Sequence, residues 1–406
     1  MIYHTHTFPN GLRIIHYPTN KQVAHCGLFI NAGSRDELEH EKGIAHFVEH
    51  LIFKGTKKRK AFHILSRMDD VGGEINAYTG KEETCIHTSF LKNDYERSLE
   101  LMADITFHSV FPGPEIKKEK EVIIDEINSY KDSPSELIFD DFEEMVFQNK
   151  GLGSNILGDP KLLKQFTPSD FKAFTHRNYL PNRMIISSVG NISFDKLVRL
   201  IDRYFGQIPS PAAEKRRSHS FSYTPEKKQV EKNTNQAHCI LGNLAYGMHH
   251  EKRIAMALLD NIIGGPGLNN RLNMALREKL GYVYHIESNY TAFSDTGLFS
   301  VYFGTDAKRL DKTLHHIHKE FEKLRHQKLG KIQLSKAKKQ LFGQIAIGAE
   351  NQASLMLSIG KSFLFTNRAD SLEEIHQMIE EIKAEDIQEI ASEILNPDKL
   401  STLIYV

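Results

Sequence analysis

The feature that most restricts the fold of this chain is a pattern that occurs twice. Ala24-His25-Cys26 recurs as Ala237-His238-Cys239, and Glu41-Lys42-Gly43-Ile44-Ala45 recurs as Glu251-Lys252-Arg253-Ile254-Ala255. The offset between the copies changes from 213 to 210 residues, which one three-residue loop deletion explains. A chain that repeats a long pattern in this way is expected to fold into two similar domains.

The length and the composition of the middle of the chain agree with two domains. With 406 residues the chain exceeds what one hydrophobic core usually supports. The stretch from Ile208 to Arg217 is polar and contains two prolines, and the sequence stays weakly patterned to about Asn233. We therefore expect an N-terminal domain over 1–210, a linker over 211–232 and a homologous C-terminal domain over 233–406.

Strand and helix signals alternate irregularly, which favours an α+β fold with two homologous domains. Pro9-Asn10-Gly11 separates two alternating runs and predicts a hairpin between Ile2 to Thr7 and Leu12 to Tyr17. Such connections indicate a largely antiparallel sheet packed against helices. Other strands are expected at Val23 to Asn31, Glu74 to Tyr78, Cys85 to Leu91 and Met184 to Gly190, and helices at Glu41 to Lys54, Phe62 to Val71, Asp94 to Phe107, Pro114 to Lys131, Glu136 to Gln148 and Pro168 to Asn178.

Charge and cysteine usage exclude several classes of function. Lys plus Arg and Asp plus Glu balance at 52 each, so no net charge attracts nucleic acid or an anionic membrane. Cys26, Cys85 and Cys239 are too few and too far apart for a disulfide framework or a thiolate metal site. The first twenty residues lack the parts of an export signal, and no apolar stretch is long enough for a membrane helix. We expect a cytoplasmic protein without nucleic-acid or membrane partners.

The segment from His46 to His50 carries the strongest chemical signal. On a helix, residues four apart share a face with Cβ atoms about 5–6 Å apart, so His46 and His50 can bind one zinc ion. Glu49 points near the same site and can take a proton from a metal-activated water. A solvated helix is the alternative, but Ile44 to Phe53 is apolar nearly all round. Burying polar side chains in such surroundings costs free energy unless a partner such as a metal ion offsets the desolvation.

A zinc site of this kind needs a third protein ligand, with the fourth position left open for water. Glu119 and Glu126 are seven residues apart and lie on one predicted helical face. Either could bind zinc while the other orients a histidine. The other interpretation of this Lys- and Glu-rich run is an exposed charged helix.

Together these residues resemble the M16 (pitrilysin/insulinase) family of zinc peptidases, whose inverted HxxEH motif defines the inverzincins. The resemblance covers nearly the whole chain and is to the short bacterial type, similar to the mitochondrial processing peptidase subunits. It rests on the order and spacing of Asn10 to Arg13, Gly33 to Glu37, His46 to His50, Phe53 to Thr56, Gly72 to Thr79, Glu119 to Glu126, Gly158 and Asn178 to Pro181.

The resemblance implies roles for the candidate residues of the first half. Glu126 would be the third zinc ligand, and Glu119 would orient a ligand histidine. Asn76 and Ala77 would bind substrate on an edge strand, to which a peptide adds by β-augmentation.

In the second half, the run from Arg277 to Tyr284 resembles the family's Arg-Glu-x-x-Gly-x-x-Tyr segment. Arg277 and Tyr284 would contact substrate and stabilise the developing oxyanion. Pro266 and two asparagines in the stretch Gly265 to Leu272 depart from the small residues expected there. In the repeat, His46, Glu49 and His50 align with Met256, Leu259 and Asp260, so the second domain would lack the metal.

The resemblance also implies an activity and a partner. We expect a zinc endopeptidase that hydrolyses peptides or unfolded polypeptides with one zinc ion per chain. Long family members close four such domains into a clamshell chamber, so two copies of this chain would form a homodimer. A heterodimer with an unseen partner is the alternative to the homodimer, and a non-catalytic or assembly subunit is the alternative to an enzyme.

One further histidine cluster invites a metal interpretation. His315, His316 and His318 lie in a pattern shared with Lys312, Lys319 and Glu320. Such a pattern fits an exposed helical face better than a second metal site.

Overall fold

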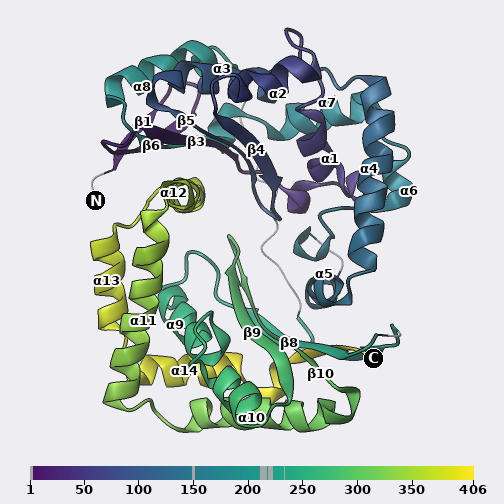
Figure 1. Ribbon diagram of the computed structural model, residues 1–406, viewed down its shortest axis with the longest axis vertical. Coiled ribbons are helices and arrows are strands. Elements are labelled where there is room, and N and C mark those ends of the chain that lie inside the picture. The colour runs from purple at the N-terminus through teal and green to yellow at the C-terminus, as the bar shows by residue number, and fades with distance from the viewer. Residues whose placement is uncertain (1–2, 149–150, 211–216, 218–222, 233) are drawn as a thin grey trace. The chain divides into compact units, whose positions relative to one another are not determined.

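The structure is a computed structural model that describes residues 3–148, 151–210, 217, 223–232 and 234–406. The chain divides into two compact units (Figure 1). The first comprises Met1–Asn128, Ser154–Ser218 and Ile347–Ser371, and the second comprises Ser129–Gly153, His219–Ala346 and Leu372–Val406. In the part of the chain that the structure describes, no helix is long and apolar enough to cross a membrane.

A mixed, mainly antiparallel sheet forms the centre of the first unit. Its described strands lie in the order β1-β2-β6-β3-β5-β4, and only the β2–β6 pair is parallel. The strands are β1 (His4–Thr7), β2 (Arg13–Pro18), β3 (Val23–Ile30), β4 (Glu74–Thr79), β5 (Thr84–Leu91) and β6 (Met184–Gly190). The helices are α1 (Ile44–Leu51), α2 (Ala61–Asp69), α3 (Tyr95–Phe107), α4 (Gly113–Lys131), α6 (Pro160–Leu163), α7 (Pro168–Asn178), α8 (Phe194–Ile201) and α12 (Gln352–Thr366).

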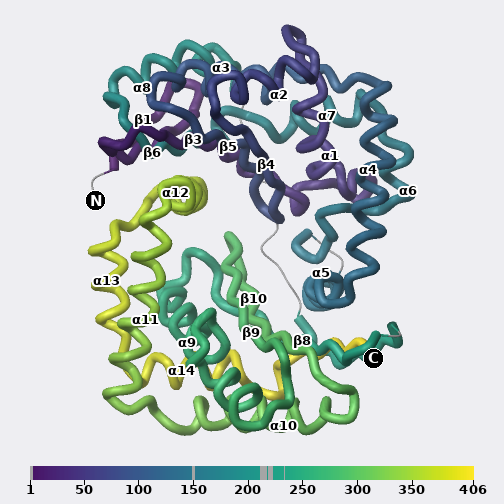
Figure 2. Tube along the Cα trace, viewed as in Figure 1, coloured from purple at the N-terminus to yellow at the C-terminus, as the bar shows by residue number. Residues whose placement is uncertain are grey.

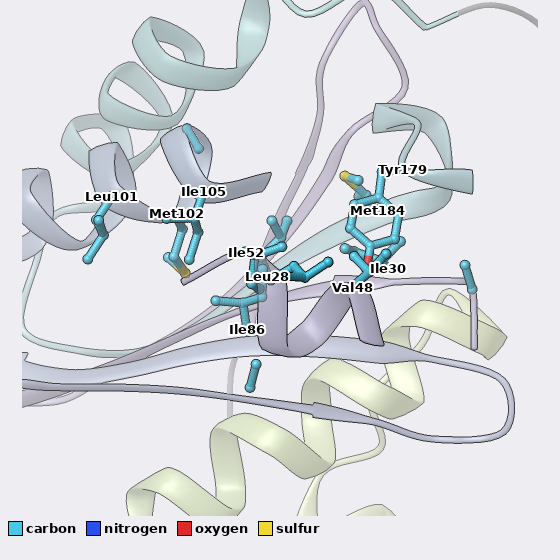
Figure 3. Packing of buried hydrophobic residues seen from close by; sticks show 14 of the residues in the cluster. Leu28, Ile30, Val48, Ile52, Ile86, Leu101, Met102, Ile105, Tyr179 and Met184 are labelled. Carbon is cyan, nitrogen blue, oxygen red and sulfur yellow. The ribbon is translucent and has the colours of Figure 1, made fainter. Parts of the chain in front are cut away.

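The central strands β3, β5 and β6 are buried on both faces of this sheet. Alternate side chains of a strand point to opposite faces. Leu28, Ile30 and Ile86 pack on the face covered by α1 and α3, where Val48 and Met102 meet them (Figure 3). Helix α12 covers the opposite face and contacts β3 and β6. Burial on both faces explains why β3 shows no strict alternation of apolar and polar residues.

The second unit repeats this topology. Its described strands lie in the order β7-β11-β8-β10-β9, with only β7–β11 parallel. They are β7 (Lys227–Val230), β8 (Ala237–Ala245), β9 (Val283–Ala292), β10 (Gly297–Thr305) and β11 (Ser401–Tyr405), and the helices are α5 (Pro134–Phe147), α9 (Arg253–Gly264), α10 (Leu310–His326), α11 (Lys331–Glu350), α13 (Leu372–Glu381) and α14 (Ala384–Ile394). Strands β2, β3, β4, β5 and β6 thus correspond in order and direction to β7, β8, β9, β10 and β11. The predicted α+β fold with an internal duplication is confirmed.

The two units do not follow the contiguous division that we expected. Helix α5 belongs by sequence to the first half, yet it packs on the second sheet, where Phe142 meets Ile240 and Leu403. Helix α12 belongs to the second half, yet it packs on the first sheet, where Met356 meets Phe29. Each sheet therefore has one face covered by a helix from the other half of the sequence, as the colours along the chain in Figure 2 show.

The predicted elements differ from the observed ones mainly at their ends. The helix predicted from Glu41 begins only at Ile44, because Gly43 has a φ of +94° that no α-helix contains. Ile2, the first residue of the expected first strand, and half of the expected linker over 211–232 lie outside the described residues. The described end of that linker contains β7, so it is part of the second sheet and not a free connection.

Candidate metal centre

Helix α1 carries the HxxEH segment, and its first turn is held by two contacts. A Cβ on Gly158 would lie 2.4 Å from Gly43 Cα, so the two glycines meet without side chains where the helix begins. The first N–H groups of a helix have no partner within the helix. The Glu37 carboxylate accepts two of them, from Gly43 N at 3.0 Å and from Ala45 N at 2.8 Å. In the sequence Glu37 stands out only as part of the segment Gly33 to Glu37, and its capping role is visible only in the tertiary structure.

The structure brings together His46, His50 and Glu126, whose donor atoms all lie within 4.8 Å of one another. Glu126 Oε2 lies 3.8 Å from His46 Nε2 and 3.7 Å from His50 Nε2. Bonds of about 2.0–2.1 Å in a tetrahedral zinc site place donor atoms roughly 3.3 Å apart. The cluster therefore fits zinc after a small approach of its side chains. Among the described residues, no other group of three His, Cys, Asp or Glu side chains has this geometry.

The environment of His46 suits a metal ligand. Burial, with a smaller contribution from His50, lowers the pKa of His46 to about 4. The imidazole is therefore neutral near pH 7, and a neutral imidazole is the form that binds metals.

Glu119 on α4 holds the second histidine in place. Its Oε2 lies 3.1 Å from His50 Nδ1, and its Oε1 lies 2.8 Å from Lys54 Nζ. Both carboxylate oxygens are thus used, and the His50 Nδ1 contact leaves Nε2 facing Glu126. Such an outer carboxylate fixes the tautomer and orientation of a metal-binding histidine. Lys54, which sequence reasoning did not assign a role, keeps the buried Glu119 charge paired.

Glu49 lies on the same helix, between the two histidines in the sequence, and its side chain is half-buried. Burial raises the pKa of its carboxyl above the usual value, while Thr79 and His50 oppose that rise. Thr79 is the last residue of β4, so the acid faces the end of the strand on which substrate binding was predicted.

The residues predicted to bind substrate lie on β4, at one edge of the first sheet. Among the described strands, β4 pairs only with β5, with Asn76 opposite His87 and Ala77 opposite Ile86. The Ala77 N–H donates to Asn76 Oδ1 at 2.8 Å. An edge strand of this kind offers unpaired main-chain groups to another strand.

Arg277 and Tyr284 lie in the second unit, and the structure brings them to one cavity of about 240 Å³. Arg277 belongs to a π-helical turn (Asn273–Glu278), and Tyr284 lies on the edge strand β9 with 81% of its surface exposed. Gly281, with a φ of +60°, turns the chain between them. The glycine-rich stretch Gly264 to Gly267 lines the same cavity.

The positions of the second unit that align with His46, Glu49 and His50 do not carry a set of metal-binding side chains. Met256 and Leu259 are fully buried on α9 and belong to the apolar core of that unit. Asp260, which aligns with His50, is largely buried as well. Neither Met256 nor Leu259 can replace a zinc ligand or a proton acceptor.

The fold is α+β with two similar units, and among the described residues one cluster, His46, His50 and Glu126, has the geometry of a metal site. Residues 13–160 match the family described as Insulinase (Peptidase family M16), and residues 165–341 match the family described as Peptidase M16 inactive domain. The chain belongs to peptidase family M16.

Relatives and solved structures agree with this family. The chain is 32% identical to the uncharacterized zinc protease YmxG of Bacillus subtilis, covering 98% of this chain and 97% of the relative. It is 33% identical to an uncharacterized zinc protease of Rickettsia felis, covering 97% and 95%. The fold matches a protease from Helicobacter pylori with a TM-score of 0.92 at 22% identity, covering 100% of this chain and 99% of the other. It also matches an M16 inactive domain protein from Pseudomonas fluorescens with a TM-score of 0.93 at 19% identity, covering 100% and 98%.

Proposed function

We propose that this chain is a zinc endopeptidase that hydrolyses peptides or unfolded polypeptides. The observation that carries the proposal is the cluster of His46, His50 and Glu126, with Glu49 on the same helix. His46, His50 and Glu126 would hold one zinc ion per chain, and a site with three protein ligands would leave room for water. The zinc proteases among the relatives support the same class of activity.

Glu49 moves the proton in this proposal. Bound zinc supplies Lewis acidity that lowers the pKa of water from about 15.7 to about 7. The Glu49 carboxylate accepts a proton from the attacking water and returns it to the leaving amine. Burial favours its protonated form after the first transfer, which suits a group that must both take and give a proton.

The substrate is held by its main chain on the edge of the first sheet. A peptide that adds beside β4 forms main-chain hydrogen bonds, and Asn76 and Ala77 contact it near the scissile bond. Arg277 and Tyr284, which share one cavity, contact the substrate and stabilise the developing oxyanion with a cation and a phenol. Main-chain recognition predicts broad specificity for extended peptides.

We also propose that two chains close into one chamber. The chain supplies two domains of the family type, and a homodimer in which each copy holds zinc is the simplest closed assembly. A cytoplasmic location remains part of this proposal.

Glu49→Gln tests the mechanism. The variant keeps both histidines and Glu126, so it should bind one zinc ion per chain with unchanged affinity. Without a proton acceptor, cleavage of a quenched peptide should fall by about 10²–10⁴-fold. Zinc content is measured by atomic absorption and turnover by fluorescence.

The matched control is Glu121→Gln, which makes the same chemical change at an exposed position of α4. It should leave both zinc content and turnover unchanged. Full turnover in Glu49→Gln, or turnover that survives complete removal of zinc by a chelator, would sink the mechanism.

A further inference from the structure

The second unit contains a cavity that the proposed peptidase function does not use. It has a volume of about 590 Å³ and lies between α10, β7 and the residues that precede and begin β11. This volume is within the range of about 300–1,000 Å³ that small-molecule sites occupy. None of the residues assigned above to zinc or peptide binding lines it.

The polar part of the lining is cationic. Lys227, Lys319 and Arg325 line the cavity together with His315, His318 and His326, whereas Glu322 is the single acidic residue among those that line it. Within the described part of the chain, neither Lys227 nor Lys319 has an ion-pair partner. Lys328, which does not line the cavity, is paired with Glu385 at 2.9 Å.

Arg325 has one side-chain atom that also lacks a partner within the described part of the chain. Its Nε is buried and has no hydrogen-bond partner among the described residues. A buried charged donor without an acceptor is costly, and an anion in the cavity would supply the acceptor.

The histidines of the cavity do not form a metal site. The described residues contain one group with metal-binding geometry, and that group is His46, His50 and Glu126. The pKa of His318 is lowered by burial and, beyond that, by the positive charges of Lys227 and His315. The cavity is therefore a region of positive potential, which attracts anions and repels cations.

Part of the cavity lining is apolar. Phe321, Leu395 and Leu400 line it and are almost fully buried, with 2%, 1% and 3% of their surfaces exposed. Cations around an apolar lining fit a ligand that combines phosphate groups with an uncharged ring system. Lys and Arg bind phosphate through charge-assisted hydrogen bonds, and the apolar side chains bury the ring.

We propose that this cavity binds a phosphorylated small molecule with a ring system, such as a nucleoside triphosphate. The site lies within the second unit and is independent of zinc. It would give the chain a ligand in addition to its peptide substrate.

Calorimetric titration of the full-length, zinc-loaded chain with ATP tests the proposal at constant ionic strength. We expect saturable binding of one ATP per chain. Lys319→Glu and Lys227→Glu should each weaken binding by about tenfold or more, because each replaces an attractive charge with a repulsive one. Both side chains are exposed, so neither change disturbs the core.

Three comparisons make the outcome decisive. Lys336→Glu, the same charge reversal at an exposed position of α11 outside the cavity, should leave ATP binding unchanged. Pyrophosphate should bind more weakly than ATP, because it cannot contact Phe321 and the two leucines, and adenosine should not bind measurably. Absence of saturable ATP binding, an equal loss in Lys336→Glu, or equal affinity for pyrophosphate and ATP would overturn the proposal.

Discussion

Asp260 occupies the position in the second unit that corresponds to His50 in the first. It lies on α9, the counterpart of α1, and aligns with His50, which we propose as a zinc ligand. Burial raises the pKa of Asp260 from 3.8 to about 6, and its Oδ1 is buried without a partner among the described residues. Ser288 opposes this rise, but among the described residues Asp260 has no ion-pair partner to offset its desolvation.

This residue predicts a pH-dependent gain in stability for Asp260→Asn. The folded-state pKa lies above the unfolded-state value, so stability falls as pH rises from about 4 to about 6. Above that window the ionised side chain costs up to about 3 kcal/mol, since one pKa unit corresponds to about 1.4 kcal/mol. Asparagine is not ionised, so the variant should be more stable by about 1–3 kcal/mol at pH 8 and equal to the parent near pH 4.

Urea unfolding of both proteins at several pH values, with zinc removed by a chelator throughout, measures this difference. Asp311→Asn, an exposed position on α10, is the control and should show no gain at any pH. A gain in Asp260→Asn that does not change with pH would contradict the assignment to ionisation.

At the scale of elements, the start of α1 determines where the two histidines lie. Gly43 has a φ of +94° and Gly158 a φ of +80°, and the two residues are in direct contact. Glu37 caps the helix that begins there. The backbone around Gly43 thus sets the direction of the helix that carries His46 and His50.

Gly158→Ala should therefore disturb the metal site from a distance in the sequence. The new Cβ would lie 2.4 Å from Gly43 Cα and 2.5 Å from Lys42 O, and alanine disfavours a φ of +80°. Overpacking costs about 1–3 kcal/mol and the left-handed backbone about 1–2 kcal/mol, so we expect a loss of about 2–5 kcal/mol. Zinc affinity should fall as well, because α1 must shift to relieve the contact.

Gly72→Ala separates the two contributions. Gly72 also has a positive φ, +69°, but a Cβ there would meet nothing within 4 Å. This variant should lose only about 1–2 kcal/mol and keep its zinc affinity. Chemical unfolding and zinc competition assays on both variants decide the matter, and equal effects would mean that the Gly43 contact has no role.

At the scale of the whole molecule, the two units are linked by exchanged helices. Phe142 of α5 is fully buried against the second sheet, although it precedes the first unit's β6 in the sequence. Met356 of α12 is buried against the first sheet in the same way, and its carbonyl oxygen accepts a hydrogen bond from Ser187 Oγ at 2.8 Å. Neither half of the sequence can complete its own unit.

Phe142→Ala should loosen the second unit and not the first. Removal of a buried phenylalanine costs about 3–5 kcal/mol. Hydrogen exchange should accelerate in β8 and β11, which α5 contacts, more than in β3 and β6. Phe62→Ala, at a residue with 74% of its surface exposed, should change neither. Faster exchange confined to the first sheet would show that α5 does not support the second.

Much of the fold could be predicted from the sequence because its signals are local. The Asn-Gly turn predicted the β1–β2 hairpin, and apolar periodicity placed α7 and β6 at their observed ends. The expected contiguous domains over 1–210 and 233–406 differ from the observed units, because the sequence of an apolar helix face does not specify which sheet it packs against. Two homologous sheets offer similar faces, so α5 and α12 could have packed on either one.

The sequence by itself determined the spacing of His46, Glu49 and His50 on one helix, since helical geometry alone places them on neighbouring faces. It also determined the twofold repeat and the absence of metal ligands from the second copy. Only the tertiary structure decided that Glu119 joins His50 to Lys54 and that Glu37 caps α1. It also decided that His315 and His318 line a cavity with Lys227. Apart from the Glu37 cap, these contacts join residues far apart in the chain, and their geometry depends on packing that no local pattern encodes.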